Sequence, residues 1–193
     1  MISNSSLKIF DKNPDLGFVC AFFSDRKRVD LKKIAKNLPK NSAFIFREYD
    51  LAREKRQELA AEIFAICKKS GVKFLIGKDL DLAQKLGTDG IHFSDLDKIP
   101  VGAHRMRPRN QAPIISLSCH SLESLKNSAF DVFFLSPIFA TKSHINAKIL
   151  GLKNLEKACK SCSKPIFALG GINEKNLQDI RNCGARGFGG IDI

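Results

Sequence analysis

The sequence contains no tryptophan, one tyrosine and two methionines among its 193 residues, although it holds fifteen phenylalanines. Proteins that bind single-stranded nucleic acid stack bases on aromatic side chains beside basic ones, and no such interleaving is seen here. The phenylalanines fall within short apolar runs, where we expect them to pack a core. No apolar run approaches the ~20 residues of a transmembrane helix. The sequence therefore argues against a membrane partner.

The N-terminus also lacks the basic segment and following apolar segment of a secretory signal. We therefore expect a cytoplasmic protein whose six scattered cysteines are reduced and mostly buried. Cys159 and Cys162 have the spacing of a zinc-ligand pair. No second pair accompanies them and they lie in a helical pattern, which disfavours a zinc site.

Acidic residues are the minority charge: 20 Asp and Glu stand against 32 Lys and Arg, a formal net charge of +12. A basic surface attracts polyanions or phosphorylated small molecules. An RNA-binding protein is one interpretation of this charge, but the absence of an RNA motif argues against a nucleic-acid partner. We expect phosphorylated small molecules as the partners.

Short apolar runs alternate with segments of helical periodicity along the chain. Continuous apolar strands joined by helices are typical of a parallel sheet that is buried on both faces. Eight such units predict a (β/α)8 TIM barrel of the α/β class, formed by a single domain over residues 1–193. A doubly wound open sheet is the alternative, disfavoured because no glycine-rich dinucleotide turn follows the first strand. The predicted strands are 17–23, 42–46, 72–77, 90–93, 112–119, 131–136, 165–169 and 187–193.

Helices are predicted between these strands by apolar spacing and by terminal residues that favour helix ends. Asn173 is the predicted cap of the last one. The predicted helices are 29–38, 51–71, 79–87, 121–128, 151–161 and 173–184.

Two glycine pairs stand one strand–helix unit apart near the end of the sequence. Gly170 and Gly171 follow the seventh predicted strand, and Gly189 and Gly190 lie in the eighth. The loops after strands 7 and 8 of such barrels often bind phosphate, and glycine lets backbone N–H groups approach an anion closely. Turn formation alone is the other interpretation. We expect a phosphate site here, with Ile191 beside the second pair.

Four stretches resemble segments of the thiamine phosphate synthase/TenI family, in the family's order and spacing. The resemblance implies an enzyme of thiamine biosynthesis, a transferase that joins hydroxymethylpyrimidine diphosphate to thiazole phosphate and releases pyrophosphate with the help of Mg²⁺. A TenI-like thiazole tautomerase, or a ligand-binding barrel without pyrophosphate chemistry, is the alternative. The stretches are "LGTDGIHFSDLD" (86–97), "ISLSCHS" (115–121), "DVFFLSPIFATKSH" (131–144) and "FALGGINEKNLQDIRNCGARG" (167–187).

The resemblance also implies roles for single residues. The implied catalytic residues are Arg47, Ser118, Lys142 and His144. The implied substrate-binding residues are Arg47, Ser118, His120, Thr141, Ser143, Gly170, Gly171, Gly189, Gly190 and Ile191. Asp97 is the implied Mg²⁺ ligand, with Asp79 as its partner and Asp95 as a substitute.

Several positions depart from the family pattern. Tyr49 stands where the family has lysine, and Gly77-Lys78 stand where it has a metal-binding Asn-Asp pair. Lys78 thus puts a cation where the metal would bind, and Asp192 puts a carboxylate where a phosphate-binding serine is usual. Little sequence follows the eighth strand, so we expect the last helix to be missing or truncated. Such a bare apolar face would suit the partner subunit of a homo-oligomer.

Overall fold

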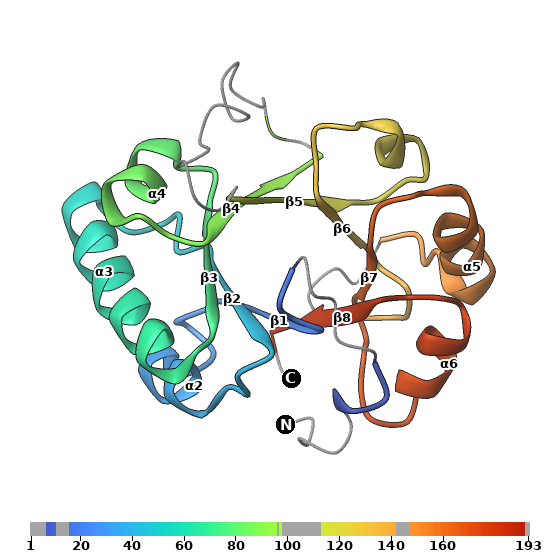
Figure 1. Cartoon of the computed structure of the whole chain (residues 1–193), viewed down its shortest axis with the longest axis horizontal. Coiled ribbons are helices and arrows are strands. Elements are labelled where there is room, and N and C mark those ends of the chain that lie inside the picture. Colours follow the sequence, from blue (N-terminus) through green and yellow to red (C-terminus); the bar gives the residue numbers. More distant parts are fainter. Residues whose placement is uncertain (1–6, 11–15, 96, 98–112, 142–146, 192–193) are drawn as a thin grey trace.

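The computed structural model describes residues 7–10, 16–95, 97, 113–141 and 147–191. Eight parallel strands form a closed barrel in chain order, and β8 pairs with β1, with Phe188 opposite Cys20. Figure 1 looks along this barrel, with the helices outside it. The predicted TIM barrel is confirmed, and β8–β1 pairing rules out the open sheet. The strands are β1 (Cys20–Phe23), β2 (Ser42–Phe46), β3 (Lys73–Gly77), β4 (Gly90–Ser94), β5 (Ile114–Cys119), β6 (Val132–Leu135), β7 (Ile166–Leu169) and β8 (Gly187–Gly190).

The helices begin and end at residues with clear local causes. Asp30 caps α2 by accepting hydrogen bonds from the N–H groups of Lys32 and Lys33. Gly71 ends α3 in a left-handed conformation with φ of 70°, which a residue with a Cβ adopts only at a cost. The helical elements are α2 (Leu31–Asn37), α3 (Arg53–Ser70), α4 (Leu80–Leu86), η2 (Glu123–Lys126, a 3₁₀ helix), α5 (Gly151–Ser161) and α6 (Leu177–Asn182).

The predicted helix at 173–184 is wrong at its start, because α6 begins only at Leu177. The Asn173 side chain accepts a hydrogen bond from the Lys175 N–H, and the Asn176 side chain accepts one from the Asn173 N–H. Asparagine side chains that bond nearby backbone favour turns over helix. The predicted helix at 121–128 is likewise reduced to η2.

Phenylalanines fill the barrel interior, and the glycines of β8 make room for them. Phe23 and Phe134 meet edge to face inside the barrel, with ring centroids 5.1 Å apart. A Cβ on Gly189 would lie 2.7 Å from Cε2 of Phe23, closer than carbon atoms pack. Gly187 is placed in the same way against Phe167. The strand-8 glycines therefore serve packing of the interior.

The outer face of β8 is covered by the N-terminal segment of the same chain. Leu7 and Phe10 are buried, and the ring of Phe10 lies 5.6 Å from that of Phe188. Arg181 of α6 donates a hydrogen bond to the carbonyl of Ile9, and Figure 1 shows this segment beside α6. The expected bare face at strand 8 is thus wrong, since Phe188 is fully buried. The covered face removes the reason for which a homo-oligomer was expected.

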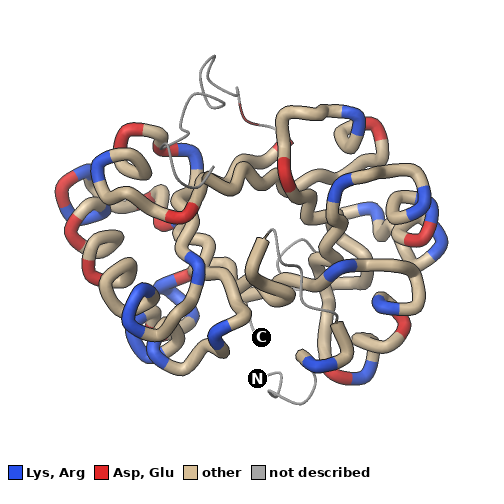
Figure 2. The backbone as a smooth tube through the Cα atoms, viewed as in Figure 1, with Lys and Arg blue, Asp and Glu red and all other residues tan. Residues whose placement is uncertain are grey.

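The charged residues lie mainly on the outer helices and loops. Figure 2 shows lysine and arginine on both sides of the barrel, interspersed with acidic residues, while the strands are almost free of charge. None of the described helices is both long and apolar enough to cross a membrane. All six cysteines are free, and Cys20, Cys67 and Cys119 are buried.

Candidate active site

Four of the predicted site residues, together with Lys78, stand at or just beyond the carboxyl ends of different strands. Arg47 follows β2, Lys78 follows β3, Asp97 lies three residues beyond β4, Ser118 is near the end of β5, and Gly170 follows β7. In a closed parallel barrel these strand ends surround one opening, the mouth at which such enzymes act. The barrel therefore brings together side chains that are far apart in the sequence.

Arg47 is held at the mouth by the loop after β1. Its N–H donates to Ser24 Oγ at 2.8 Å, its Nη2 donates to the Ser24 carbonyl at 3.3 Å, and its guanidinium lies 5.2 Å from the Phe23 ring centroid. Burial lowers the pKa of Arg47, although nearby Tyr49 and acidic groups oppose that shift. Its Nε is buried with no hydrogen-bond partner among the described residues. Arg47 thus carries a desolvated charge that an anionic ligand would satisfy.

Lys78 and Asp97 form an ion pair at the same opening. Lys78 Nζ lies 2.5 Å from Asp97 Oδ1 and 4.9 Å from the centroid of the Tyr49 ring. The other oxygen of Asp97 accepts hydrogen bonds from the Ser94 N–H at 2.7 Å and the Ser94 hydroxyl at 2.9 Å. Burial alone would raise the pKa of Asp97, but the bonds from Lys78 and Ser94 outweigh it and lower that pKa. Asp97 is therefore a carboxylate with both oxygens engaged.

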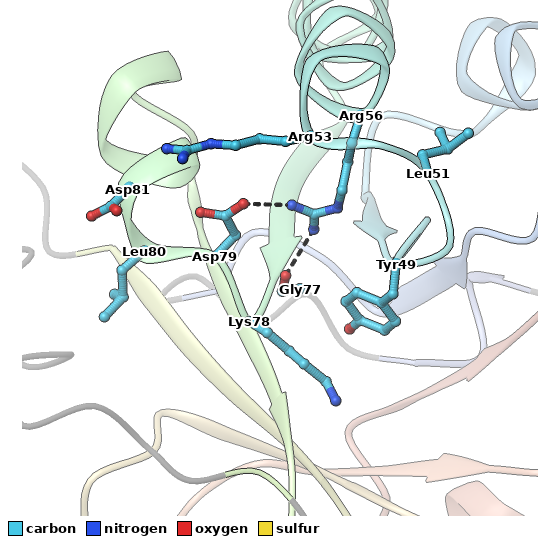
Figure 3. A pocket seen from close by; sticks show the side chains of 9 residues that line it. All are labelled: Tyr49, Leu51, Arg53, Arg56, Gly77, Lys78, Asp79, Leu80 and Asp81. Atoms are coloured by element: carbon cyan, nitrogen blue, oxygen red, sulfur yellow. Dashed lines mark hydrogen bonds and ion pairs between the residues drawn. The ribbon is translucent and has the colours of Figure 1, made fainter.

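Asp79 points away from Lys78, although the two residues are neighbours in the sequence (Figure 3). Asp79 Oδ2 lies 2.6 Å from Nη1 of Arg56, and Oδ1 accepts a hydrogen bond from the Leu82 N–H at the start of α4. Arg56, which is buried, also donates to the Gly77 carbonyl at 2.9 Å. An open cavity of about 640 Å³ lies beside this turn, lined by the residues labelled in Figure 3.

These contacts decide how well the described residues fit a resident Mg²⁺ ion. Each aspartate expected as a ligand is already engaged by a basic side chain: Asp97 by Lys78, Asp79 by Arg56, and Asp95 by His120. No group of three or more ligating side chains exists within the part of the chain that the structure describes. Mg²⁺ is usually held by one or two carboxylates together with substrate phosphates and water. Because each of these carboxylates already has a basic partner, the described residues do not fit a resident Mg²⁺ ion.

His120 and Asp95 form a second polar pair at the mouth. Nδ1 of His120 lies 3.0 Å from Asp95 Oδ1, and the His120 N–H donates to Asp95 Oδ2 at 2.8 Å. The imidazole is half-exposed, whereas the carboxylate is mostly buried. A carboxylate in this position holds the ring in one orientation, which is how a histidine is positioned for proton transfer.

His92 of β4 is buried close enough to Arg47 and Lys78 for both charges to affect it, and it was not among the residues expected from the sequence. Its Nδ1 is 2.8 Å from Ser116 Oγ, and its Nε2 is 3.1 Å from Ser118 Oγ. Ser116 Oγ donates to the Ile91 carbonyl, which assigns the imidazole proton to Nδ1 and makes Nε2 the acceptor of the Ser118 hydroxyl. The only signal in the sequence is one histidine inside an otherwise apolar strand.

Because His92 is buried, its environment controls its charge. Burial lowers the pKa of His92 to about 3, and the charges of Arg47 and Lys78 add to the shift against the opposing effect of Asp97. A neutral His92 orients the Ser118 hydroxyl so that the oxygen lone pairs of Ser118 remain available to a ligand. Ser118 thus fits a hydrogen-bonding role.

The first glycine pair has a local structural cause. Gly170 and Gly171 have φ of 90° and 68°, and a Cβ on Gly170 would lie 2.8 Å from the Cβ of Pro137. The Asn176 side chain donates a hydrogen bond to the Gly171 carbonyl at 3.0 Å. This contact lies where the predicted helix 173–184 was expected to begin. A phosphate site at these glycines stays a prediction.

The remaining expected residues divide between those placed and those outside the described part of the chain. Thr141 is half-buried near the glycine pair, while Gly190 and Ile191 are half-buried at the end of β8 and Gly189 lies in the packed interior. The expected site residues outside the described part are Lys142, Ser143 and His144, and Asp192 also lies there.

A TIM barrel whose mouth gathers Arg47, Lys78 and hydrogen-bonding side chains defines a class of enzyme that handles anionic small molecules. The family model for thiamine monophosphate synthase matches residues 20–192, and the chain belongs to this family.

Similar proteins carry names from the same family. A protein of Aquifex aeolicus named "Putative thiamine-phosphate synthase 2" is 34% identical over 177 residues, which cover 88% of this chain and 94% of that protein. The thiamine-phosphate synthase of Oceanobacillus iheyensis is 36% identical over 154 residues, covering 76% of this chain and 73% of that one. The structure of a thiamine phosphate pyrophosphorylase from Pyrococcus furiosus has the same fold, with a TM-score of 0.76 at 21% identity over 91% of this chain and 86% of that one.

Proposed function

We propose that this protein is a thiamine-phosphate synthase, a transferase that joins hydroxymethylpyrimidine diphosphate to thiazole phosphate. In this reaction the bond between the pyrimidine methylene carbon and the diphosphate oxygen breaks. Pyrophosphate leaves with the bonding electrons, and the thiazole nitrogen forms a bond to the methylene carbon. Family membership supports the reaction class. The partners are phosphorylated small molecules, and the single-domain organisation and cytoplasmic location stay predictions.

The observation that carries this proposal is the pair of cations at the ends of adjacent strands. Arg47 follows β2 and Lys78 follows β3, and the charge of each lowers the pKa of the same buried His92. Negative charge grows on the diphosphate oxygens as the bond to carbon breaks. Fixed cations at that point stabilise the transition state more than the ground state. Arg47, with a buried Nε that has no described partner, suits this role.

The direct test is a coupling assay with both phosphorylated substrates, with thiamine phosphate and pyrophosphate detected by mass. The unmodified protein should form both products in equal amounts. Arg47→Met should slow turnover by roughly 10²–10³-fold, the usual loss for one contact that stabilises transition-state charge.

Arg186→Met is the matched control, because Arg186 is exposed just before β8, at the opposite end of the barrel from the mouth. It should keep unmodified turnover. Absence of product from the unmodified protein would overturn the proposal, and full activity of Arg47→Met would remove Arg47 from the mechanism.

A thiazole tautomerase is the second candidate, and the His120–Asp95 pair favours it. Tautomerisation moves a proton between ring positions, for which a histidine oriented by a carboxylate is suited. In D₂O such an enzyme would introduce deuterium into the thiazole phosphate without any pyrimidine substrate, and His120→Asn should abolish that exchange. Exchange by the unmodified protein without coupling would favour the tautomerase over the synthase.

A further inference from the structure

The ammonium group of Lys78 is held in one place at the barrel mouth. It contacts Asp97 Oδ1 at 2.5 Å and lies over the Tyr49 ring at 4.9 Å. Asp97 is anchored in turn by two hydrogen bonds from Ser94. The Lys78 side chain is 46% exposed and that of Asp97 only 11%. The positive partner of this pair, and not the negative one, therefore faces the solvent of the mouth.

The backbone at Lys78 adopts a conformation that is unusual for lysine. Its φ is 62°, the only positive value among the described residues other than glycine. The turn is kept by a hydrogen bond of 2.9 Å from the Lys78 N–H to the His92 carbonyl and another of 2.9 Å from the Asp79 N–H to the Gly77 carbonyl. A left-handed conformation costs a residue with a Cβ roughly 1 kcal/mol or more, and glycine avoids most of it. Strain of this kind tends to be kept where a side chain has a function.

We infer that Lys78, positioned by Asp97 and Tyr49, is a built-in cation that binds the diphosphate group of the substrate in place of a divalent metal ion. The identity of the substrate rests on the proposed function. An ammonium group is a compact point charge with three donors, which suits the oxygens of a phosphate. Arg47, at the end of the adjacent strand, supplies a second cation for the same group.

The charges around Lys78 favour an ammonium over a metal at this point. The Asp97 oxygen that a metal would need is already bound by Lys78, and its other oxygen is bound by Ser94. A divalent ion beside the ammonium would add repulsion between like charges. Asp79 offers no replacement, because Arg56 holds its carboxylate.

The experiment is calorimetric titration of inorganic pyrophosphate into the whole protein, once in EDTA and once in Mg²⁺. The unmodified protein should bind pyrophosphate in EDTA. Lys78→Asn removes the charge and suits the turn, because asparagine tolerates positive φ. It should weaken that binding roughly 10- to 100-fold, the loss expected for one charge-assisted hydrogen bond.

Two further variants and one control make the result specific. Lys78→Gly relieves the strained backbone and should fold at least as stably, with the same loss of affinity. Lys78→Asp places a second carboxylate near Asp97 and should make pyrophosphate binding depend on Mg²⁺. Lys160→Met removes an exposed lysine from the last turn of α5 and should bind as the unmodified protein does.

Several results would overturn the inference. One is pyrophosphate binding by the unmodified protein only when Mg²⁺ is present, and another is no binding in either buffer. Unchanged affinity of both Lys78→Asn and Lys78→Gly in EDTA would do the same. None of these results decides the proposed synthase activity, which is measured separately by product formation. If the protein binds pyrophosphate through Lys78 but forms no thiamine phosphate, the inference about Lys78 stands and the proposed synthase function is wrong.

Discussion

Acid should destabilise this protein through His92, and replacing that residue should flatten part of the pH dependence. Burial and nearby cations lower the pKa of His92 to about 3 in the folded state, whereas histidine in an unfolded chain titrates near ~6.5. Between these two values the unfolded chain binds a proton that the folded protein does not bind. The free energy of unfolding therefore falls as the pH falls from about 6.5 toward 3, and is unaffected by this group above that window. From pH 7 to pH 5 the loss is about 2 kcal/mol, at ~1.4 kcal/mol per pH unit below 6.5.

The measurement is urea unfolding of the unmodified protein and of His92→Asn at pH 5, 6 and 7. Asparagine can still hydrogen-bond to a neighbouring serine, but it does not titrate. The loss of stability between pH 7 and pH 5 should be smaller in His92→Asn by about 2 kcal/mol. Carboxylates titrate in both proteins, so they cancel in this difference. Equal pH slopes for the two proteins would refute the argument that His92 stays neutral when folded.

Two further variants test the packing around β8. Phe10→Ala should lower the free energy of unfolding by about 3 kcal/mol at every pH, because the ring is buried against Phe188. An unchanged urea midpoint would contradict this packing. Because Phe10→Ala changes no titrating group, it is also the control for His92→Asn. Gly189→Ala should cost roughly 1–3 kcal/mol through crowding in the interior, as its Cβ would lie 2.7 Å from Phe23. The same unfolding assay checks it, and wild-type stability would show that the barrel interior has room to spare.

All eight strands were predictable because a parallel strand enclosed by helices buries both of its faces. The residues of β2, for example, are buried at every position, so its sequence reads as one apolar run. The order of the strands also followed, because right-handed crossovers leave few topologies for alternating strands and helices. The barrel was thus predictable from local sequence patterns alone.

Features that depend on contacts distant in the sequence were not predictable. Phe10 covers Phe188 although 178 positions separate them, and no periodic pattern links the two. The start of α6 was mispredicted for a local reason. Asparagine is a residue type that often caps helices, but whether Asn173 forms a cap or a turn depended on the hydrogen bond from its N–H to Asn176.

The candidate site was predictable as a location and much less so as a set of contacts. Arg47, Asp97 and Ser118 lie at strand ends, as expected from their positions after apolar runs. The pairing of Lys78 with Asp97 depends on a left-handed turn that sends Lys78 and Asp79 in opposite directions. A sequence pattern does not reveal a positive φ at a lysine, because lysine rarely adopts it.

The contacts at the mouth connect the proposed binding of a diphosphate with the predicted sensitivity to acid. Arg47 and Lys78 lie close enough to His92 for both charges to lower its pKa. A protonated His92 would add a third positive charge to this cluster in a buried position, at a cost in desolvation and repulsion. The same two cations that suit a diphosphate therefore keep the imidazole neutral, and the neutral imidazole orients Ser118.

The net charge of +12 does not create this cluster, because most basic residues lie on outer helices among acidic ones. Placement at the strand ends, and not the overall excess of lysine and arginine, gives the mouth its chemistry.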